Sequence, residues 1–440
     1  MPQRADGSAT ATGSSDVREP RHPIPAPART ALALIAATAV LLPVSGVAQA
    51  QTVAPPPPCS NRSAPPPPVD TSEVPAPGRP SPEPLPVPDP PVGGERLGAC
   101  DAPVLPQGAP PPPPNLTSPA WLVADLDSGE VLAALDPHAR HRPASTIKTL
   151  TALTVLRDLD LDDRLVATQE DANREGSKVG LAPGASYSVR QVLAGMMMQS
   201  GNDAAHALAM KRGGVNVMVA RMNEVARDIG AADTRAATPS GLDGPGMSTS
   251  AYDMALIFRA AMREPEFRKV IGTRQTELPG PPGQPPFLVS NDNRVLLNYP
   301  GGIGGKTGFT NDAQHTFVGA ADRDGRRLVA VMLRGANQPE KLSQQTMRLL
   351  DYGYALAPGS SVGTLNPPEP EPPAPVAAAE PPAGGVQDQA PQDEGSALFD
   401  SLGAPLTLLF GSGLAIAGAF GFWRHRTKLA AAQRRETPPD

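Results

Sequence analysis

Proline, concentrated in two long stretches, most strongly limits which parts of this chain can form a compact domain. The chain has 440 residues, of which 57 are proline, and only 4% of its residues are aromatic. Proline removes a backbone donor and fixes one backbone angle, so Pro-rich sequence without apolar periodicity favours extended, unpacked chain. We therefore expect residues 51–115 to be disordered and residues 358–400 to be a second Pro-rich linker.

The sequence between these stretches, residues 116–357, has the apolar patterning of a folded domain. Residues 121–125 and 131–135 are predicted to form a hairpin. A helical middle follows, in which Ser188 and Gln191, three residues apart, predict a capping box at a helix start. Strands are expected again after residue 274, one of them at residues 295–298. Strands that frame a helical middle indicate an α/β or α+β domain in which the first hairpin and the later strands share one sheet.

Two apolar runs outside this domain predict a membrane topology. Residues 1–50 combine arginines, an apolar run and a small-x-small sequence, as in a signal peptide that is either cleaved or kept as an anchor. Residues 402–423 are long and apolar enough for a transmembrane helix, and the basic residues of 424–440 favour a cytoplasmic tail. The chain between the two runs is then extracytoplasmic and held at the cell membrane.

The two cysteines of the chain, Cys59 and Cys100, both lie in the first Pro-rich segment. An oxidising compartment favours a disulfide between them, which would close part of this segment into a loop. The formal net charge of -6 gives no reason to expect nucleic acid as a partner.

Ser145 and Lys148 lie three residues apart at a predicted helix start. Positions three apart share one face of a helix, so the hydroxyl and the amine can meet. A serine hydroxyl is a useful nucleophile only beside a base, and lysine can be that base where its surroundings keep it partly neutral. Because Ser-x-x-Lys also occurs by chance in a chain of this length, the interpretation needs support from other motifs.

Two further triplets follow in the chain. Ser-Gly-Asn at 200–202 falls where one predicted helix ends and the next begins, and its hydroxyl and carboxamide can relay protons or hold a substrate amide. Lys-Thr-Gly at 306–308 falls on a predicted strand. There an ammonium and a hydroxyl can bind a carboxylate, and the glycine lets a substrate backbone lie close.

The three motifs, in this order, resemble the set of the penicillin-interacting serine enzymes. The resemblance is closest to the D-alanyl-D-alanine carboxypeptidases of peptidase family S11, and it covers about residues 119–357. The supporting sequence blocks are residues 142–152, 176–181, 200–205, 238–242, 248–251 and 305–310. The family implies a β-lactamase/transpeptidase-like fold, with a mostly antiparallel sheet flanked by helices and a helical lobe.

The resemblance also implies a reaction and the catalytic residues for it. Ser145 would attack the carbonyl of the penultimate D-Ala in a peptidoglycan stem, with Lys148 as its general base. Ser200 and Asn202 would support proton transfer and hold the peptide. The product would be an acyl-enzyme that water hydrolyses. The implied partners are stem peptides that end in D-Ala-D-Ala, with β-lactams as covalent inhibitors.

The remaining implied roles concern substrate binding. Lys306, Thr307 and Gly308 would bind the peptide and its terminal carboxylate. The backbone N–H groups of Ser145 and Phe309 would form the oxyanion hole, a task that suits donors held rigidly by the fold.

The sequence departs from many relatives outside these motifs. Ser240 and Met247 stand where relatives often carry histidine, which affects the expected substrate preference more than the reaction type. Arg334 and Lys341 are both candidates for a downstream cation that assists carboxylate binding in some relatives. The linker at 358–400 occupies the place of a β-rich domain that many relatives have.

Other functions compete with this interpretation. A class A β-lactamase would need a Glu-x-x-Leu-Asn loop, and none lies between residues 200 and 306. A non-catalytic cell-wall-binding module would be expected to have lost at least one catalytic side chain, and all are present. Endopeptidase or transpeptidase activity would use the same acyl-enzyme. No cofactor or metal is expected, because His138 and His141 are the only closely spaced histidines.

Overall fold

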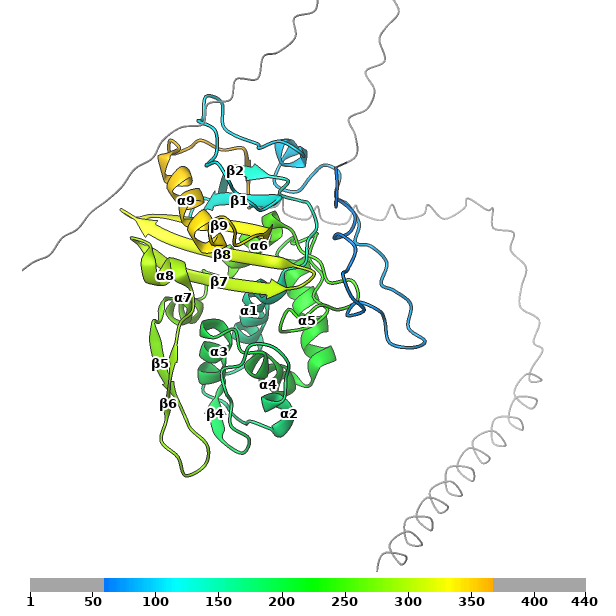
Figure 1. Cartoon of the computed structure of the whole chain (residues 1–440), viewed down its shortest axis with the longest axis vertical. Helices are drawn as coiled ribbons and strands as arrows, with labels where there is room; N and C mark the ends of the chain where they lie inside the picture. The colour runs from blue at the N-terminus through cyan, green and yellow to red at the C-terminus, as the bar shows by residue number, and fades with distance from the viewer. Residues whose placement is uncertain (1–58, 367–440) are drawn as a thin grey trace, which may run out of the picture. The chain divides into compact units, whose positions relative to one another are not determined.

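The computed structural model describes residues 59–366, which form one domain (Figure 1). Its helices are α1 (Lys148–Asp158), α2 (Gln169–Ala172), α3 (Val189–Met198), α4 (Asn202–Arg212), α5 (Val215–Asp228), α6 (Ala251–Ala261), α7 (Pro265–Gly272), α8 (Arg294–Asn298) and α9 (Leu342–Ala355), with the 3-10 helices η1 (Glu95–Gly98) and η2 (Ala144–Ile147). Its strands are β1 (Ala120–Asp125), β2 (Glu130–Leu135), β3 (Arg164–Val166), β4 (Ser186–Ser188), β5 (Gln275–Leu278), β6 (Phe287–Ser290), β7 (Gly302–Thr310), β8 (Gln314–Arg323), β9 (Arg326–Gly335) and β10 (Gly363–Thr364).

The predicted signal peptide, transmembrane helix and cytoplasmic tail lie outside the described residues. Within residues 59–366, no helix has the length and apolar character needed to cross a membrane.

The main sheet of the described domain has six strands in the order β10-β2-β1-β9-β8-β7. Every neighbouring pair in it is antiparallel. β1 and β2 form the predicted hairpin, and β9 joins β1 to the later strands. The prediction of a mostly antiparallel sheet that combines the first hairpin with the later strands is therefore confirmed. β7, which carries the Lys-Thr-Gly triplet, lies at one edge of this sheet.

Side chains of the sheet alternate between two apolar cores. In β1, Leu122 and Ala124 enter the core shared with the helical lobe, whereas Trp121 and Val123 enter the core under α9. This alternation follows from the two-residue period of a strand. α9 lies against β8 and β9 (Figure 1), and α6 packs on β1 and β9 from the other face. The sheet is thus buried between two helical layers.

Local capping explains one correct and one wrong prediction. Ser188, an expected helix cap, accepts a hydrogen bond from the N–H of Gln191 at the start of α3. Residues 295–298, expected to be a strand, belong instead to helix α8. Asn293 caps that helix, since its side chain accepts the N–H of Leu296 at 3.1 Å. A side-chain cap stabilises a helix start and here outweighs the strand preference of a short apolar run.

The expectation that residues 51–115 are disordered is wrong for the described part of that segment. Cys59 and Cys100 form a disulfide, and Val104 pairs with Ala134 of β2 as an antiparallel bridge. The carbonyls of the Pro-rich backbone accept hydrogen bonds from buried arginines of the domain. Hydrophobic periodicity does not reveal these hydrogen bonds, because their acceptors are backbone carbonyl oxygens.

The domain also extends beyond its predicted end at residue 357. β10 pairs with β2, and both Val362 and Leu365 are buried in the apolar core. Residues 358–366, expected to be linker, are therefore part of the folded domain.

Candidate active site

The candidate nucleophile Ser145 lies on η2, which leads directly into α1. Lys148 is the first residue of α1, and its Nζ lies 2.8 Å from Ser145 Oγ. One helical turn thus brings the hydroxyl and the amine together, as their spacing predicts. Ala144 has a φ of 47°, a left-handed conformation that is unusual for a residue other than glycine. The backbone just before Ser145 is therefore strained and needs its surroundings to hold it.

Lys148 is fully buried, and three oxygen atoms surround its amine. Besides Ser145 Oγ, its Nζ lies 2.7 Å from Asn202 Oδ1 and 2.5 Å from the backbone oxygen of Ser240. Burial lowers the pKa of Lys148 well below its usual value, and the charge of Lys306 lowers it further. The lowered pKa favours the neutral amine, which is the form that a general base needs.

The Ser-Gly-Asn triplet forms the turn between α3 and α4. Ser200 adopts a φ of 57° and is buried. Asn202 Nδ2 donates to the carbonyl oxygen of Glu175 at 2.7 Å, and the Asn202 N–H donates to the carbonyl oxygen of Ser177 at 2.7 Å. Because the side-chain nitrogen Nδ2 of Asn202 is held by the Glu175 carbonyl, the side-chain oxygen Oδ1 is the atom that faces Lys148.

Lys306 on β7 is the second buried lysine of the site, with only 1% of its surface exposed. Its Nζ donates to the backbone oxygen of Thr307 at 2.8 Å. Burial lowers the pKa of Lys306 to about 8, although the negative charge of Asp292 opposes this effect. Two buried lysines with lowered pKa values therefore share this site.

Two glycines allow the backbone around Ser145 to pack closely. A Cβ on Gly308 of β7 would lie 2.8 Å from the backbone nitrogen of Ser145. A Cβ on Gly241, whose φ is 86°, would lie 2.0 Å from the carbonyl oxygen of Ala144. Any larger residue would push β7 or the loop at Gly241 away from the nucleophile, so both positions require glycine.

One hollow of about 420 Å³ unites the three motifs. The predicted site residues that line it are Ser145, Ser200, Asn202, Thr307, Gly308 and Phe309. The other two, Lys148 and Lys306, are buried and reach the site only through their contacts. The structure therefore brings the residues of all three motifs, together with Phe309, to one place.

Several residues of the site were missed by sequence reasoning. Asp292 and His315 line the hollow, and the ring of His315 lies 4.6 Å from that of Phe309. Asp203 accepts the backbone N–H groups of residues 179–181, and its charge opposes the effect of burial on the pKa of Lys148. The position of Asp203 next to the Ser-Gly-Asn triplet was the one sequence signal available.

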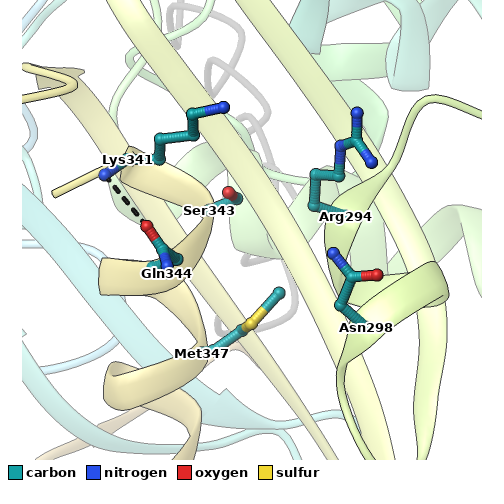
Figure 2. A pocket seen from close by; sticks show the side chains of 6 residues that line it. All are labelled: Arg294, Asn298, Lys341, Ser343, Gln344 and Met347. Carbon is teal, nitrogen blue, oxygen red and sulfur yellow. Dashed lines mark hydrogen bonds between the residues drawn. The ribbon is translucent and has the colours of Figure 1, made fainter. Parts of the chain in front are cut away.

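Of the two cations considered for carboxylate binding, Lys341 is the better placed. It lines an adjoining hollow together with Thr307 and His315, and Arg334 does not line that hollow. A further hollow of about 380 Å³ continues outward between Lys341 and Arg294. Figure 2 shows these two cations on opposite sides of this hollow, with Lys341 at the start of α9 and Arg294 at the start of α8. Two cations, Lys341 and Arg294, thus line the hollow that adjoins the site at Thr307.

The sequence is similar to proteins of known activity. A family model, peptidase S11, described as D-alanyl-D-alanine carboxypeptidase, matches residues 107–337. The D-alanyl-D-alanine carboxypeptidase DacB2 of Mycobacterium tuberculosis is 48% identical over 269 residues, which are 60% of this chain and 91% of that protein. The D-alanyl-D-alanine carboxypeptidase DacF of Bacillus subtilis is 31% identical over 240 residues, which are 53% of this chain and 61% of that protein.

Solved structures share the fold. The crystal structure of a D-alanyl-D-alanine carboxypeptidase from Mycobacterium tuberculosis matches with a TM-score of 0.57 and 47% identity, over 59% of this chain and 99% of that chain. The crystal structure of the Streptomyces K15 DD-transpeptidase matches with a TM-score of 0.53 and 27% identity, over 55% of this chain and 99% of that chain.

Proposed function

Because the chain belongs to the peptidase S11 family of D-alanyl-D-alanine carboxypeptidases, we propose that it removes the terminal D-Ala from peptidoglycan pentapeptide stems through an acyl-enzyme on Ser145. The observation that carries the proposal is the 2.8 Å contact between Ser145 Oγ and the buried amine of Lys148. This pair opens onto a hollow that the other two motifs also line.

The first step joins Ser145 to the substrate. Neutral Lys148 accepts the proton of Ser145 Oγ while that oxygen attacks the carbonyl carbon of the penultimate D-Ala. Asn202 Oδ1 and the backbone oxygen of Ser240 then accept hydrogen bonds from the ammonium that forms. Burial and the nearby charge of Lys306 disfavour that ammonium, so Lys148 readily passes the proton on.

We assign to the backbone N–H groups of Ser145 and Phe309 the role of stabilising the negative charge that develops on the carbonyl oxygen. Thr316 of β8 donates to the carbonyl oxygen of Pro143 at 2.8 Å and so ties the sheet to the segment before the nucleophile. Gly308 lets β7 lie against that segment. Donors fixed in this way need no rearrangement as charge develops, which lowers the barrier.

The second step releases D-Ala. Collapse of the tetrahedral intermediate breaks the peptide bond, and the leaving amine needs a proton. Lys148 holds the proton from Ser145 Oγ and can return it through the hydroxyl of Ser200, which lines the same hollow. We assign to Thr307 and Lys306 the binding of the terminal carboxylate, with Lys341 as a further cation beyond them. Water then hydrolyses the ester and frees Ser145.

Penicillin sensitivity follows from the same chemistry, since a β-lactam offers Ser145 a strained amide. The test is the intact mass of the full-length protein before and after brief exposure to benzylpenicillin, with the drug and D-Ala release assayed in parallel. We expect a lasting adduct and D-Ala release in the wild type and neither in folded Ser145→Ala. The matched control is Ser128→Ala, an exposed serine in the β1–β2 turn, which should behave as wild type.

The other outcomes separate the competing functions. Undiminished D-Ala release by Ser145→Ala would remove Ser145 from its assigned role. Rapid loss of the drug without a lasting adduct would favour a β-lactamase. An intact drug and no adduct in folded protein would favour a non-catalytic cell-wall-binding module.

The proposal includes a location at the cell membrane, with the catalytic domain outside and residues 424–440 in the cytoplasm. It is supported by the apolar runs at the two ends of the sequence. Cell fractionation of the full chain and of a chain that ends at Asp400 tests it. The shorter protein should be exported and soluble, and its retention in the membrane after signal processing would contradict the anchor.

A further inference from the structure

The N-terminal strap, residues 59–106, precedes the part of the chain that the family model matches (blue in Figure 1). The disulfide between Cys59 and Cys100 closes it into a loop. The strap lies outside that match, and its contacts with the rest of the domain indicate what it does.

The first contact is with Arg140, which has only 1% of its surface exposed. Its Nη1 donates to the carbonyl oxygens of Ser63 at 2.8 Å and Leu85 at 2.6 Å, and its Nη2 donates to that of Pro86 at 2.6 Å. Its Nε donates to Asp233 Oδ1, which lies outside the strap. A buried guanidinium needs all its acceptors, so the strap is a structural part of the domain.

The second contact is with Arg142, three residues before the nucleophile. Arg142 is buried, and Glu73 of the strap binds it with both carboxylate oxygens, Oε2 at 2.8 Å from Nη2. The third donor, Nη1, bonds the carbonyl oxygen of Pro66 at 2.7 Å. Arg142 lies two residues before the strained Ala144. The strap thus holds the chain that enters the nucleophile turn at Ser145.

The third contact is with Asp312, in the loop that follows β7. Ser72 Oγ donates to Asp312 Oδ2 at 3.3 Å, and the backbone N–H of Val69 donates to Oδ1. Asp312 is buried and lies three residues after Phe309. The same short piece of strap therefore reaches both segments that carry the proposed oxyanion donors.

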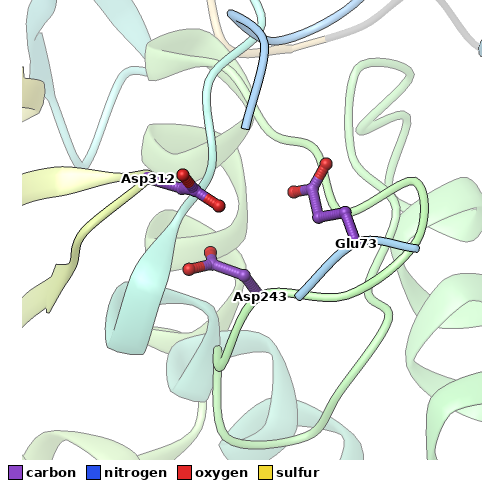
Figure 3. A group of neighbouring side chains, drawn as sticks. All are labelled: Glu73, Asp243 and Asp312. Atoms are coloured by element: carbon purple, nitrogen blue, oxygen red, sulfur yellow. The ribbon is translucent and has the colours of Figure 1, made fainter. Parts of the chain in front are cut away.

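Glu73 lies where these contacts converge. Figure 3 shows its carboxylate facing those of Asp243 and Asp312, and oxygen atoms of all three lie within 4.8 Å of one another. Asp243 directly follows Leu242, which lines the catalytic hollow. The guanidinium of Arg142, paired with Glu73, is the cation that offsets this negative charge. The strap therefore meets three segments of the rim of the site at Glu73.

We propose that the N-terminal strap is a positioning element of the active site and that Glu73 is its positioning residue. Glu73 holds the segment that contains Ser145 through its ion pair with Arg142. Val69 and Ser72 of the same strap join it to the segment that contains Phe309 through Asp312. This inference rests on the proposed function, in which the N–H groups of these two segments stabilise the oxyanion. A displacement of about 1 Å at a reacting centre can reduce the rate roughly 100-fold. The strap is therefore expected to act on kcat in addition to stability.

Glu73→Gln in the full-length protein tests the inference. The substitution keeps the size of the side chain and removes the charge that binds Arg142. We expect kcat for D-Ala release, per folded molecule, to fall about tenfold with a smaller change in KM. Glu83→Gln is the matched control, because the Glu83 side chain is exposed in the same strap and no hydrogen bond or ion pair of that side chain occurs within residues 59–366. It should leave kcat unchanged.

The folded fraction is measured by thermal unfolding, so that lost activity is separated from lost structure. Asp312→Asn is a second variant that weakens the other strap contact, and it should also lower kcat per folded molecule. Wild-type kcat in both folded variants, or equal losses in Glu73→Gln and Glu83→Gln, would overturn the inference while the proposed function stands. A wild-type protein that neither releases D-Ala nor binds benzylpenicillin would refute the proposed function, and the inference with it.

Discussion

Replacing the buried Lys306 by methionine is predicted to stabilise the fold while it removes activity. Burial lowers the pKa of Lys306 from 10.5 to about 8, so the folded protein disfavours its charged form. At about 1.4 kcal/mol per pKa unit, this corresponds to a cost of about 3 kcal/mol to the folded state. Methionine fills a similar volume without charge, and the lost hydrogen bond to the Thr307 carbonyl offsets about 1 kcal/mol. The predicted gain in the free energy of unfolding at pH 7 is therefore about 2 kcal/mol.

The gain should depend on pH in a fixed direction. The folded-state pKa of Lys306, about 8, lies below the unfolded value of 10.5, so between these values the unfolded chain binds more protons. The contribution of Lys306 to the wild-type free energy of unfolding therefore rises with pH across this window, and its full cost is present below about pH 8. The variant lacks this rise, so its advantage over wild type should shrink towards pH 10.5.

Urea unfolding of both proteins at pH 7 and pH 10, followed by circular dichroism, measures this difference. Lys269→Met is the matched control, since the Lys269 side chain is 70% exposed, and it should change stability by less than about 1 kcal/mol at either pH. A loss of stability in Lys306→Met at pH 7 would refute the reasoning. So would a gain that is as large at pH 10 as at pH 7.

Two further predictions concern the site backbone and the strap. Gly241→Ala should lower D-Ala release and the melting temperature, because its Cβ would lie 2.0 Å from the Ala144 carbonyl oxygen. Gly184→Ala is the control, since Gly184 has a similar φ of 82° but the nearest atom to its new Cβ is 3.8 Å away. Equal losses in both variants would contradict the steric argument. Replacing Cys59 and Cys100 together by serine should lower the free energy of unfolding by about 3 to 4 kcal/mol, because the bond spans 41 residues. An unchanged urea midpoint under oxidising conditions would contradict this.

The features that the sequence determined by itself are those set by neighbouring residues. Ser145 and Lys148 meet because one helical turn places them on the same face, and no other part of the chain is needed for that. The hairpin of β1 and β2 and the cap of α3 by Ser188 are local in the same sense. Short-range geometry has few solutions, so residue types and spacing were enough to predict these local features. The prediction that the three motifs form one active site rested on the resemblance to the peptidase family.

Only the tertiary structure decided what surrounds those residues. Lys148 meets Asn202 and the backbone oxygen of Ser240, which are 54 and 92 residues away in the chain, and its lowered pKa comes first from burial by the whole domain. The N-terminal strap was predicted to be disordered, because its anchor is a set of carbonyl oxygens that meet buried arginines from distant positions. Burial and long-range hydrogen bonds depend on how the complete chain packs, and local spacing carries no information about either.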